Sequence, residues 1–327
     1  MFPALDALKI MSTMNKHKNF DDTVDALNTF SLDPSSVSTG AEVITIYTQQ
    51  VTTKDELLTV KRENLWKDAM RFYKIASARK SMLFNKFRVD FDGEVGVDAG
   101  SLSIEFFTKF FEQARSELFE MVPSGIYLIP KRSGGNLTSF KIFGMAMAHS
   151  LMHGGPPFPY LHLWCYLMLL DKSDDEIAAC LFESYENLIP LNAGSSTVIQ
   201  FLNKLSICKS NDEIQAILDS AEGPAFEQII NSSQWDINVE VNINNIETLK
   251  SIILWEELVT KREKQIKAMR EGMEILGFLP FLQNYEYLLR EFFVGNTKEL
   301  TPEVLSQIIL WDDAENPDHP AYPTLHQ

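Results

Sequence analysis

Hydrophobic and polar residues alternate strictly between positions 87 and 91, where Phe87, Val89 and Phe91 are separated by Arg88 and Asp90. A period of two is that of a half-buried strand. The following residues, 92–100, are rich in glycine and aspartate, which is the composition of a turn. A capping serine at position 101 then precedes four phenylalanines at helical spacing: Phe106, Phe107, Phe110 and Phe111. The pattern predicts a strand, a tight turn and a helix with an aromatic face.

Taken alone, this stretch indicates packing rather than chemistry. A calcium loop counted from Asp90 would need glycine and glutamate where Val95 and Ser101 stand. A phosphate-binding loop would need a lysine directly after its last glycine, and none is present. The residues themselves therefore predict a turn that packs a helix on a strand.

Other segments show either strand or helix patterning. Alternation or β-branched residues predict strands at 43–47, 125–130 and 236–243. A helix at 63–80 would bury Leu65, Ala69, Phe72 and Ile75. Helical spacing also predicts helices at 140–153, 160–170, 174–185, 225–231 and 279–292.

Capping residues and breaks refine this prediction. Ser210 and Glu213 predict a capping box for a helix reaching residue 221, and Thr301 before Pro302 predicts another helix start. The longest helical run, 245–272, carries an apolar stripe that Arg262 interrupts. One amphipathic helix on a domain core is the commoner arrangement for such a stripe, and a coiled coil is the alternative.

Composition adds a large core and a strong negative charge. The 327 residues are 45% hydrophobic with 22 phenylalanines, enough for one large or two ordinary domains. The net charge of -16 argues against a nucleic-acid-binding protein, because phosphate neutralisation needs clustered lysine and arginine. It suits partners that present basic surfaces.

The cysteine pattern and the N-terminus predict an intracellular protein of the cytoplasm or nucleus. Cys165, Cys180 and Cys208 form no C-x-x-C pair, so neither a disulfide framework nor a zinc site is expected. The first residues lack the apolar core of a signal peptide. The uncharged run 142–170 is broken by glycines and prolines at 154–159, which predicts two buried helices and no membrane span.

The candidate ligands in this run are predicted to be structural. His149 and His153 stand four residues apart on one helical face, but Ser150 follows the first histidine where a zinc protease needs glutamate. Cys165 lies in an apolar helix and is expected to be a core thiol. No catalytic, cofactor-binding or metal-binding residue is predicted.

The strand-turn-helix stretch resembles the signature near the start of the HECT domain of ubiquitin ligases. There, a strand ending in F-x-G-E-x-G-x-D-x-G leads into a helix that begins with a charged residue and two aromatics. The matching residues are Phe91, Gly93, Glu94, Gly96, Asp98, Gly100, Glu105, Phe106 and Phe107. The family usually has a second glycine where Ser101 stands.

Two later stretches are similar to the same family. The pair of apolar helices joined by a Gly-Pro turn fits it at Phe140, Gly144, Gly154, Leu169 and Leu170. A looser match follows at Lys261, Arg262, Gln265, Gly272, Pro280 and Gly295. The way in which this sequence diverges from the family pattern resembles an expanded animal group within the family, the G2/M-phase-specific ligases.

The resemblance, which covers about residues 59–311, implies an α+β, mainly helical fold. This fold is the N-terminal lobe of a HECT domain, with short strands and without the second, cysteine-bearing lobe. Residues 1–58 would form an N-terminal extension and connector, and residues 312–327 a tail. In the family this lobe recruits a ubiquitin-conjugating (E2) enzyme through a small subdomain, which would correspond to residues 205–241.

In HECT ligases a cysteine of the second lobe, in a T-C-x-N-like context, accepts ubiquitin as a thioester. No cysteine follows Cys208 here, and none has a threonine directly before it. Three explanations are open: a fragment or truncated gene product, a degenerate non-catalytic member, or a ligase that takes its acceptor cysteine from elsewhere. The chain is expected to have E2 and ubiquitin as partners and to dock E2 without completing transfer. The alternative is a non-catalytic interaction or scaffold protein on a degenerate HECT fold.

Overall fold

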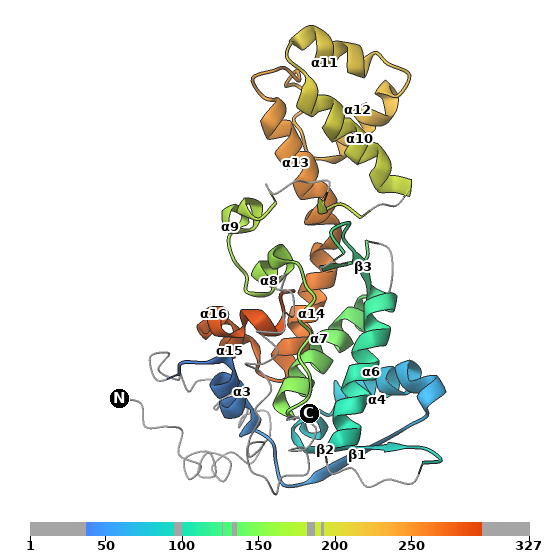
Figure 1. The fold of residues 1–327 in the computed structure, drawn as a ribbon, viewed down its shortest axis with the longest axis vertical. Coiled ribbons are helices and arrows are strands. Elements are labelled where there is room, and N and C mark those ends of the chain that lie inside the picture. The colour runs from blue at the N-terminus through green and yellow to red at the C-terminus, as the bar shows by residue number, and fades with distance from the viewer. Residues whose placement is uncertain are drawn as a thin grey trace, which may run out of the picture. The chain divides into compact units, whose positions relative to one another are not determined.

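The computed structural model describes residues 37–94, 100–125, 127–132, 136–181, 187–190 and 193–295. These residues are mainly helical with four short strands, as predicted (Figure 1). The strands are β1 (Asp55–Val60), β2 (Lys86–Phe91), β3 (Phe119–Met121) and β4 (Leu128–Pro130). The α-helices are α3 (Gly40–Thr48), α4 (Leu65–Ala76), α5 (Ser81–Phe84), α6 (Ser101–Leu118), α7 (Leu137–Met152), α8 (Leu163–Leu169), α9 (Asp174–Ala179), α10 (Ala193–Ile207), α11 (Asn211–Leu218), α12 (Gly223–Ser232), α13 (Ile246–Leu258), α14 (Glu263–Ile275), α15 (Leu279–Asn284) and α16 (Glu286–Leu289). The 3-10 turns are η2 (Arg62–Asn64), η4 (Thr260–Arg262) and η5 (Arg290–Phe292).

The predicted strand-turn-helix unit is present at β2 and α6. The strand alternates as expected, with Phe87, Val89 and Phe91 buried, and it pairs in parallel with β1. The aromatic face of α6 is fully packed in the core. The helix begins one residue earlier than expected. Gly100, at φ 111°, is the N-cap, and Ser101, which was predicted to be the cap, is the first helical residue. Gly96 and Asp98 lie outside the described residues.

An arginine joins both ends of this turn. Arg62 binds Glu94, three residues after β2, and Glu105 on α6, and its guanidinium lies 4.1 Å from the ring centre of Phe91. The hydrogen bonds from Arg62 lower the pKa of both carboxyl groups. Glu94 and Glu105, which carry part of the HECT-like pattern, thus have a structural role.

Helices α7 and α14 pack against each other at the centre of the fold (Figure 1). A Cβ on Gly144 would clash with the backbone carbonyl of Met269, and a Cβ on Gly272 would clash with that of Lys141. The two helices therefore approach as closely as backbones can, because each presents a glycine at the contact.

The uncharged run forms two separate buried helices, α7 and α8, as predicted. They are joined through Gly154, which has φ 68°, and the proline-containing segment after it. Within the part of the chain that the structure describes, no helix is both long and apolar enough to cross a membrane.

Helices α10, α11 and α12 pack on one another and on α13 (Figure 1). Their small core is built around stacked rings of Phe201 and Phe226, 4.6 Å apart, with Ile214 and Leu202 buried beside them. Ser210 caps α11 by accepting from the Glu213 amide, whereas the Glu213 carboxylate binds the Lys209 amide rather than that of Ser210. We call α10, α11 and α12 with the segment 233–245 the small helical group.

Two predicted strands are wrong. Residues 43–47 are helical in α3, because Thr39 and Glu42 form a capping box and Val43 and Tyr47 bury the same helical face. Residues 236–243 form turns, because Asp236 accepts from the Asn238 amide and so holds the chain in an Asx turn.

Several helices are shorter than predicted. The run 245–272 is divided into α13, η4 and α14 at Arg262, and the stripe 279–292 is divided into α15, α16 and η5. Ile75, expected in the core, is 47% exposed. The helices predicted at 63–80 and 210–221 are present with shorter bounds, and the one predicted at 174–185 is present as α9, with residues 182–185 outside the described residues. The start predicted at Thr301 also lies outside them.

The packed core includes residues before Thr59, which itself lies within β1. Val43 and Tyr47 of α3 belong to the same core as α7, and the Tyr47 hydroxyl donates to the Leu276 carbonyl at 3.0 Å. The segment 40–58 is therefore part of this fold rather than a connector.

The contact between α7 and α14 yields a stability prediction. We expect Gly144→Ala to lower the free energy of unfolding by about 2–3 kcal/mol, because the methyl group forces two packed backbones apart. Gly93→Ala is the matched control. Gly93 has φ 86° and open space around it, so it should cost only about 1 kcal/mol of backbone strain. Urea denaturation followed by circular dichroism would measure both, and equal losses would contradict the close approach.

Candidate functional site

Two of the three cysteines, Cys165 and Cys208, are unfavourably placed as nucleophiles. Cys165 is fully buried on α8, and burial raises the pKa of its thiol well above the ordinary range. Cys208 follows α10, where burial and the Glu213 carboxylate raise the thiol pKa. Cys180 follows α9, with its Sγ 3.6 Å from the Glu176 carbonyl oxygen. All three lie in the described part of the chain, and none forms a disulfide.

Thioester relay requires a thiolate that is accessible and stabilised by a nearby positive charge or helix N-terminus. Cys165 has no access, and Cys208 has a carboxylate where a cation is needed. The prediction that Cys165 is a core thiol is confirmed.

His149 and His153 do not form a metal site. The Nδ1 atom of His149 lies 3.0 Å from the Tyr73 hydroxyl, and Nε2 of His153 lies 3.0 Å from the Leu83 carbonyl oxygen. Phe87 packs edge-on against the His149 ring, with centroids 4.7 Å apart. Among the described residues, no group of three or more histidine, cysteine or acidic side chains could hold a metal ion.

The small helical group leaves one face of α10 open to solvent, and we call this shallow surface the groove. The groove has a volume of about 510 Å³ and is lined by Ser196, Ile199, Gln200, Asn203, Lys204 and Ile207. These residues recur at three- and four-residue spacing, so they share one face of the helix. The opposite face, with Phe201 and Leu205, is buried in the small core.

Exposed apolar residues occur at the end of the groove and in the turns after α12. Ile207 at the end of α10 is 74% exposed and Ile237 in the following turns is 78% exposed, while Val239 is half-exposed. Large exposed aliphatic side chains mark a protein-binding surface where they form a contiguous patch.

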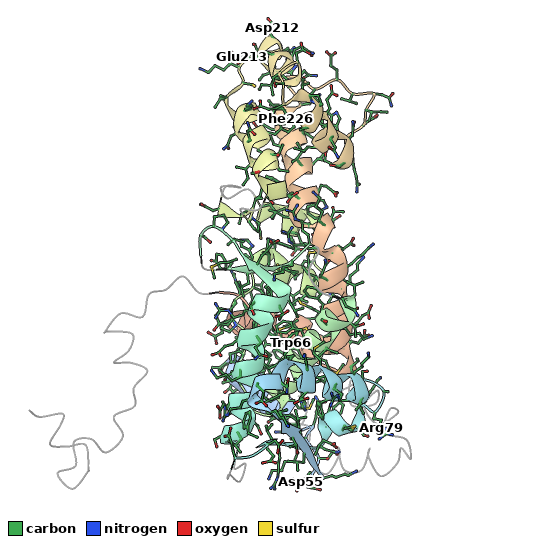
Figure 2. The ribbon with its side chains drawn as sticks, turned by 90° about the vertical axis from the view of Figure 1, so that its right-hand side faces the viewer. Asp55, Trp66, Arg79, Asp212, Glu213 and Phe226 are labelled. Atoms are coloured by element: carbon green, nitrogen blue, oxygen red, sulfur yellow. The ribbon has the colours of Figure 1, made fainter. Side chains whose placement is uncertain are left out.

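The small helical group is rich in acidic residues. Residues 193–245 contain two lysines and seven carboxylates, a net charge of -5. All seven carboxylates are exposed: Asp212, Glu213, Asp219, Glu222, Glu227, Asp236 and Glu240. Asp212 and Glu213 lie at the start of α11 (Figure 2). The small helical group thus has an acidic surface, and Lys204 on the groove is paired with Glu222.

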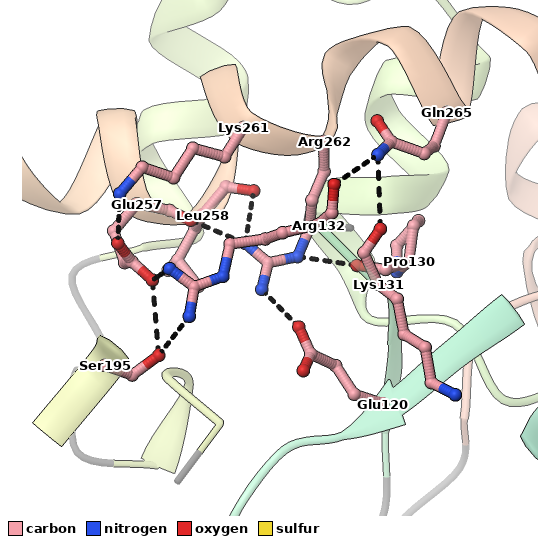
Figure 3. Close-up of polar contacts among 10 residues, drawn as sticks. All are labelled: Glu120, Pro130, Lys131, Arg132, Ser195, Glu257, Leu258, Lys261, Arg262 and Gln265. Carbon is pink, nitrogen blue, oxygen red and sulfur yellow. Dashed lines mark hydrogen bonds and ion pairs between the residues drawn. The ribbon is translucent and has the colours of Figure 1, made fainter. Parts of the chain in front are cut away.

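A buried ion-pair network joins this group to the rest of the fold (Figure 3). Glu257, buried at the end of α13, binds Arg132 at 2.6 Å and Lys261 at 2.7 Å. Ser195 of α10 accepts a hydrogen bond of 2.7 Å from the same Arg132. The first turn of α10 and the last turn of α13 are therefore attached to the segment after β4.

The second half of the network is centred on Arg262. Its guanidinium is completely buried, donates to the Pro130 carbonyl at 2.7 Å, and forms an ion pair with Glu120 of β3. Gln265 donates to the carbonyls of Lys131 and Arg132 at 3.2 and 3.1 Å. Lys261, Arg262 and Gln265, the looser part of the HECT-like pattern, all lie in this junction.

Sequence reasoning located only part of this surface. The expected docking segment, 205–241, contains Ile207, Ile237 and Val239 but omits most of the groove on α10. The groove has a sequence signal, because Ile199 and Ile207 are apolar on the side of α10 opposite its core residues. The exposure of Ile237 and Val239 was missed because their alternation predicted a strand with a buried face.

No protein-family model matches the chain, and no curated protein matches it in sequence. The function must therefore be argued from the surface itself and from the residue pattern.

The buried contacts of Arg262 predict a large loss of stability when the arginine is removed. We expect Arg262→Met to lower the free energy of unfolding by about 3–5 kcal/mol, because Glu120 and the Pro130 carbonyl lose their donor in a buried site. Changing Glu120 to Gln as well should recover part of the loss, since the remaining group is then uncharged. Lys267→Ala, which removes an exposed ion pair on α14, is the control and should cost under about 1 kcal/mol. Urea denaturation would test all three, and a small effect of Arg262→Met would contradict the role of the junction.

The buried histidines predict weaker folding in mild acid. Burial holds the pKa of His149 well below its ordinary value, with the neighbouring His153 adding to the effect. The unfolded chain then binds more protons below about pH 6.5, so stability should fall as pH drops through that value, by up to about 1.4 kcal/mol per pH unit per proton. His149→Gln should flatten this dependence between pH 7 and 5, measured by denaturation at each pH. An unchanged slope would show that His149 does not titrate.

Proposed function

We propose that this chain is the E2-docking lobe of a HECT-type ubiquitin ligase. In this proposal the small helical group binds a ubiquitin-conjugating enzyme, and the chain's own thiols do not accept ubiquitin. The observation that carries the proposal is the open face of α10 with Ile207, together with exposed Ile237, on a helical group that overlaps the segment expected for E2 docking. The strand-turn-helix pattern at 91–107 supplies the link to the family.

The surface has the properties of a protein-binding site rather than a reaction centre. It presents Ile199 and Ile207 among polar side chains, and none of its described groups is buried with a strongly shifted pKa. The nearest thiol, Cys208, has its pKa raised by burial and by Glu213 and is therefore a poor nucleophile.

The second candidate is an interaction protein that keeps this fold without E2 binding. The acidic residues of the small helical group favour an interaction protein, because they would attract any partner with a basic surface. E2 binding at the groove separates the two functions.

The test is binding of purified chain to a panel of E2 enzymes by biolayer interferometry. We expect at least one E2 to bind, and the double substitution Ile207→Ser with Ile237→Ser to weaken binding about tenfold or more, because both residues would lie at the apolar centre of the interface. Leu57→Ser is the control, since Leu57 is also a large exposed aliphatic residue, 60% exposed, but lies on β1.

A ubiquitin-charging assay with the same E2 enzymes completes the test. We expect no reductant-sensitive ubiquitin adduct on this chain. Failure of every E2 to bind would favour the interaction protein. A thioester adduct lost on substitution of one cysteine by serine would overturn the assignment as a docking lobe without an acceptor.

A further inference from the structure

The solvent face of α4 carries a cluster of cations. Lys67, Arg71 and Lys74 follow at helical spacing, and Arg79 and Lys80 continue the series in the turn after the helix. All five side chains are exposed. We call these five residues the basic face; α4 runs between the labelled Trp66 and Arg79 in Figure 2.

These cations are poorly compensated by the protein itself. Residues 65–80 contain five basic residues and one carboxylate, in a chain whose net charge is -16. That carboxylate, Asp68, lies 3.9 Å from Arg71. For Lys67, Lys74, Arg79 and Lys80, no carboxylate of the described residues lies within 4.0 Å. Like charges gathered on one helical face repel one another, so a bound partner with negative charge would relieve a local cost.

An aliphatic side chain lies among these charges. Ile75 is adjacent to Lys74 and one helical turn from Arg71, and it is 47% exposed. The face therefore offers a hydrophobic contact surrounded by cations.

We propose that the basic face binds an acidic segment of a protein partner, with an apolar residue of that segment on Ile75. This surface lies on different elements from the small helical group and does not depend on E2 docking.

The packing of α4 favours a protein segment over a lipid surface. A membrane-binding amphipathic helix buries its apolar face among the acyl chains. The apolar face of α4 is already in the core, where Leu65, Ala69, Phe72 and Tyr73 are buried. Trp66 and Met70 pack partly against the same core, so Ile75 is the large apolar residue of α4 that stands exposed, which is too little for stable membrane binding. Nucleic acid is disfavoured because the rest of the chain would repel a long polyanion.

The test uses a fluorescently labelled poly-glutamate peptide with one central leucine, titrated with the full chain at low and at physiological salt. We expect Lys67→Glu with Lys74→Glu to weaken binding about tenfold, because two attractions become repulsions. Ile75→Ser should weaken binding while leaving its salt dependence unchanged. The control Lys264→Glu with Lys267→Glu makes the same charge change on α14 and should leave binding within about twofold, since distant exposed charges are screened.

Circular dichroism confirms folding of each variant, and Lys67→Ala with Lys74→Ala provides a milder pair if the glutamate pair is unfolded. Equal weakening by the α14 control would overturn the proposal, because attraction would then be a property of the whole chain. Binding to phosphatidylserine vesicles but not to the peptide would also overturn it. So would self-association of the chain that is lost with the Lys67 and Lys74 variants, since a second copy would then be the occupant.

Discussion

The complete burial of the Arg262 guanidinium is the constraint on which the arrangement of this protein depends. A charged group without water requires an ion pair and a hydrogen bond for each donor, and the protein supplies Glu120 and the carbonyls of Pro130 and Glu257. These partners come from β3, from the end of β4 and from α13. A continuous helix through residues 245–272 would not place the Arg262 guanidinium on these partners. The chain instead breaks the helix at η4.

That turn separates two packing regions. On one side, α14 crosses α7 at a contact that only glycine permits; on the other, α13 packs against α10 and α12 over a small core of its own. The Glu257 network holds the first turn of α10 at this point through Ser195. The small helical group is consequently attached at its base, while its groove and acidic residues are left to solvent.

Sequence patterns predicted the elements whose periodicity matched their burial. The alternation at β2 and the aromatic spacing of α6 are confirmed because these residues face a single core. The failures at 43–47 and 236–243 have a common cause, since side-chain hydrogen bonds from Thr39 and Glu42, and from Asp236, decide the backbone where alternation alone cannot. Ile75 was misplaced because helical spacing gives the width of an apolar stripe only approximately. The groove on α10 could have been found from the second set of apolar residues on that helix. The contacts of Arg262 with Pro130 and Glu120 could not be predicted from local sequence, because these partners are 132 and 142 positions away along the chain.

The residues that resemble the HECT family are, in the described structure, mostly residues that shape the fold. Gly144 and Gly272 permit the crossing of α7 and α14, Gly100 caps α6, and Glu94 and Glu105 bind Arg62. None of these side chains lies on the groove of α10. Constraints on packing are shared by every protein that keeps a fold, whereas a docking surface changes with its partner. The resemblance therefore bears more directly on the fold than on the activity, and the binding properties of the small helical group and of the basic face must be established on those surfaces themselves.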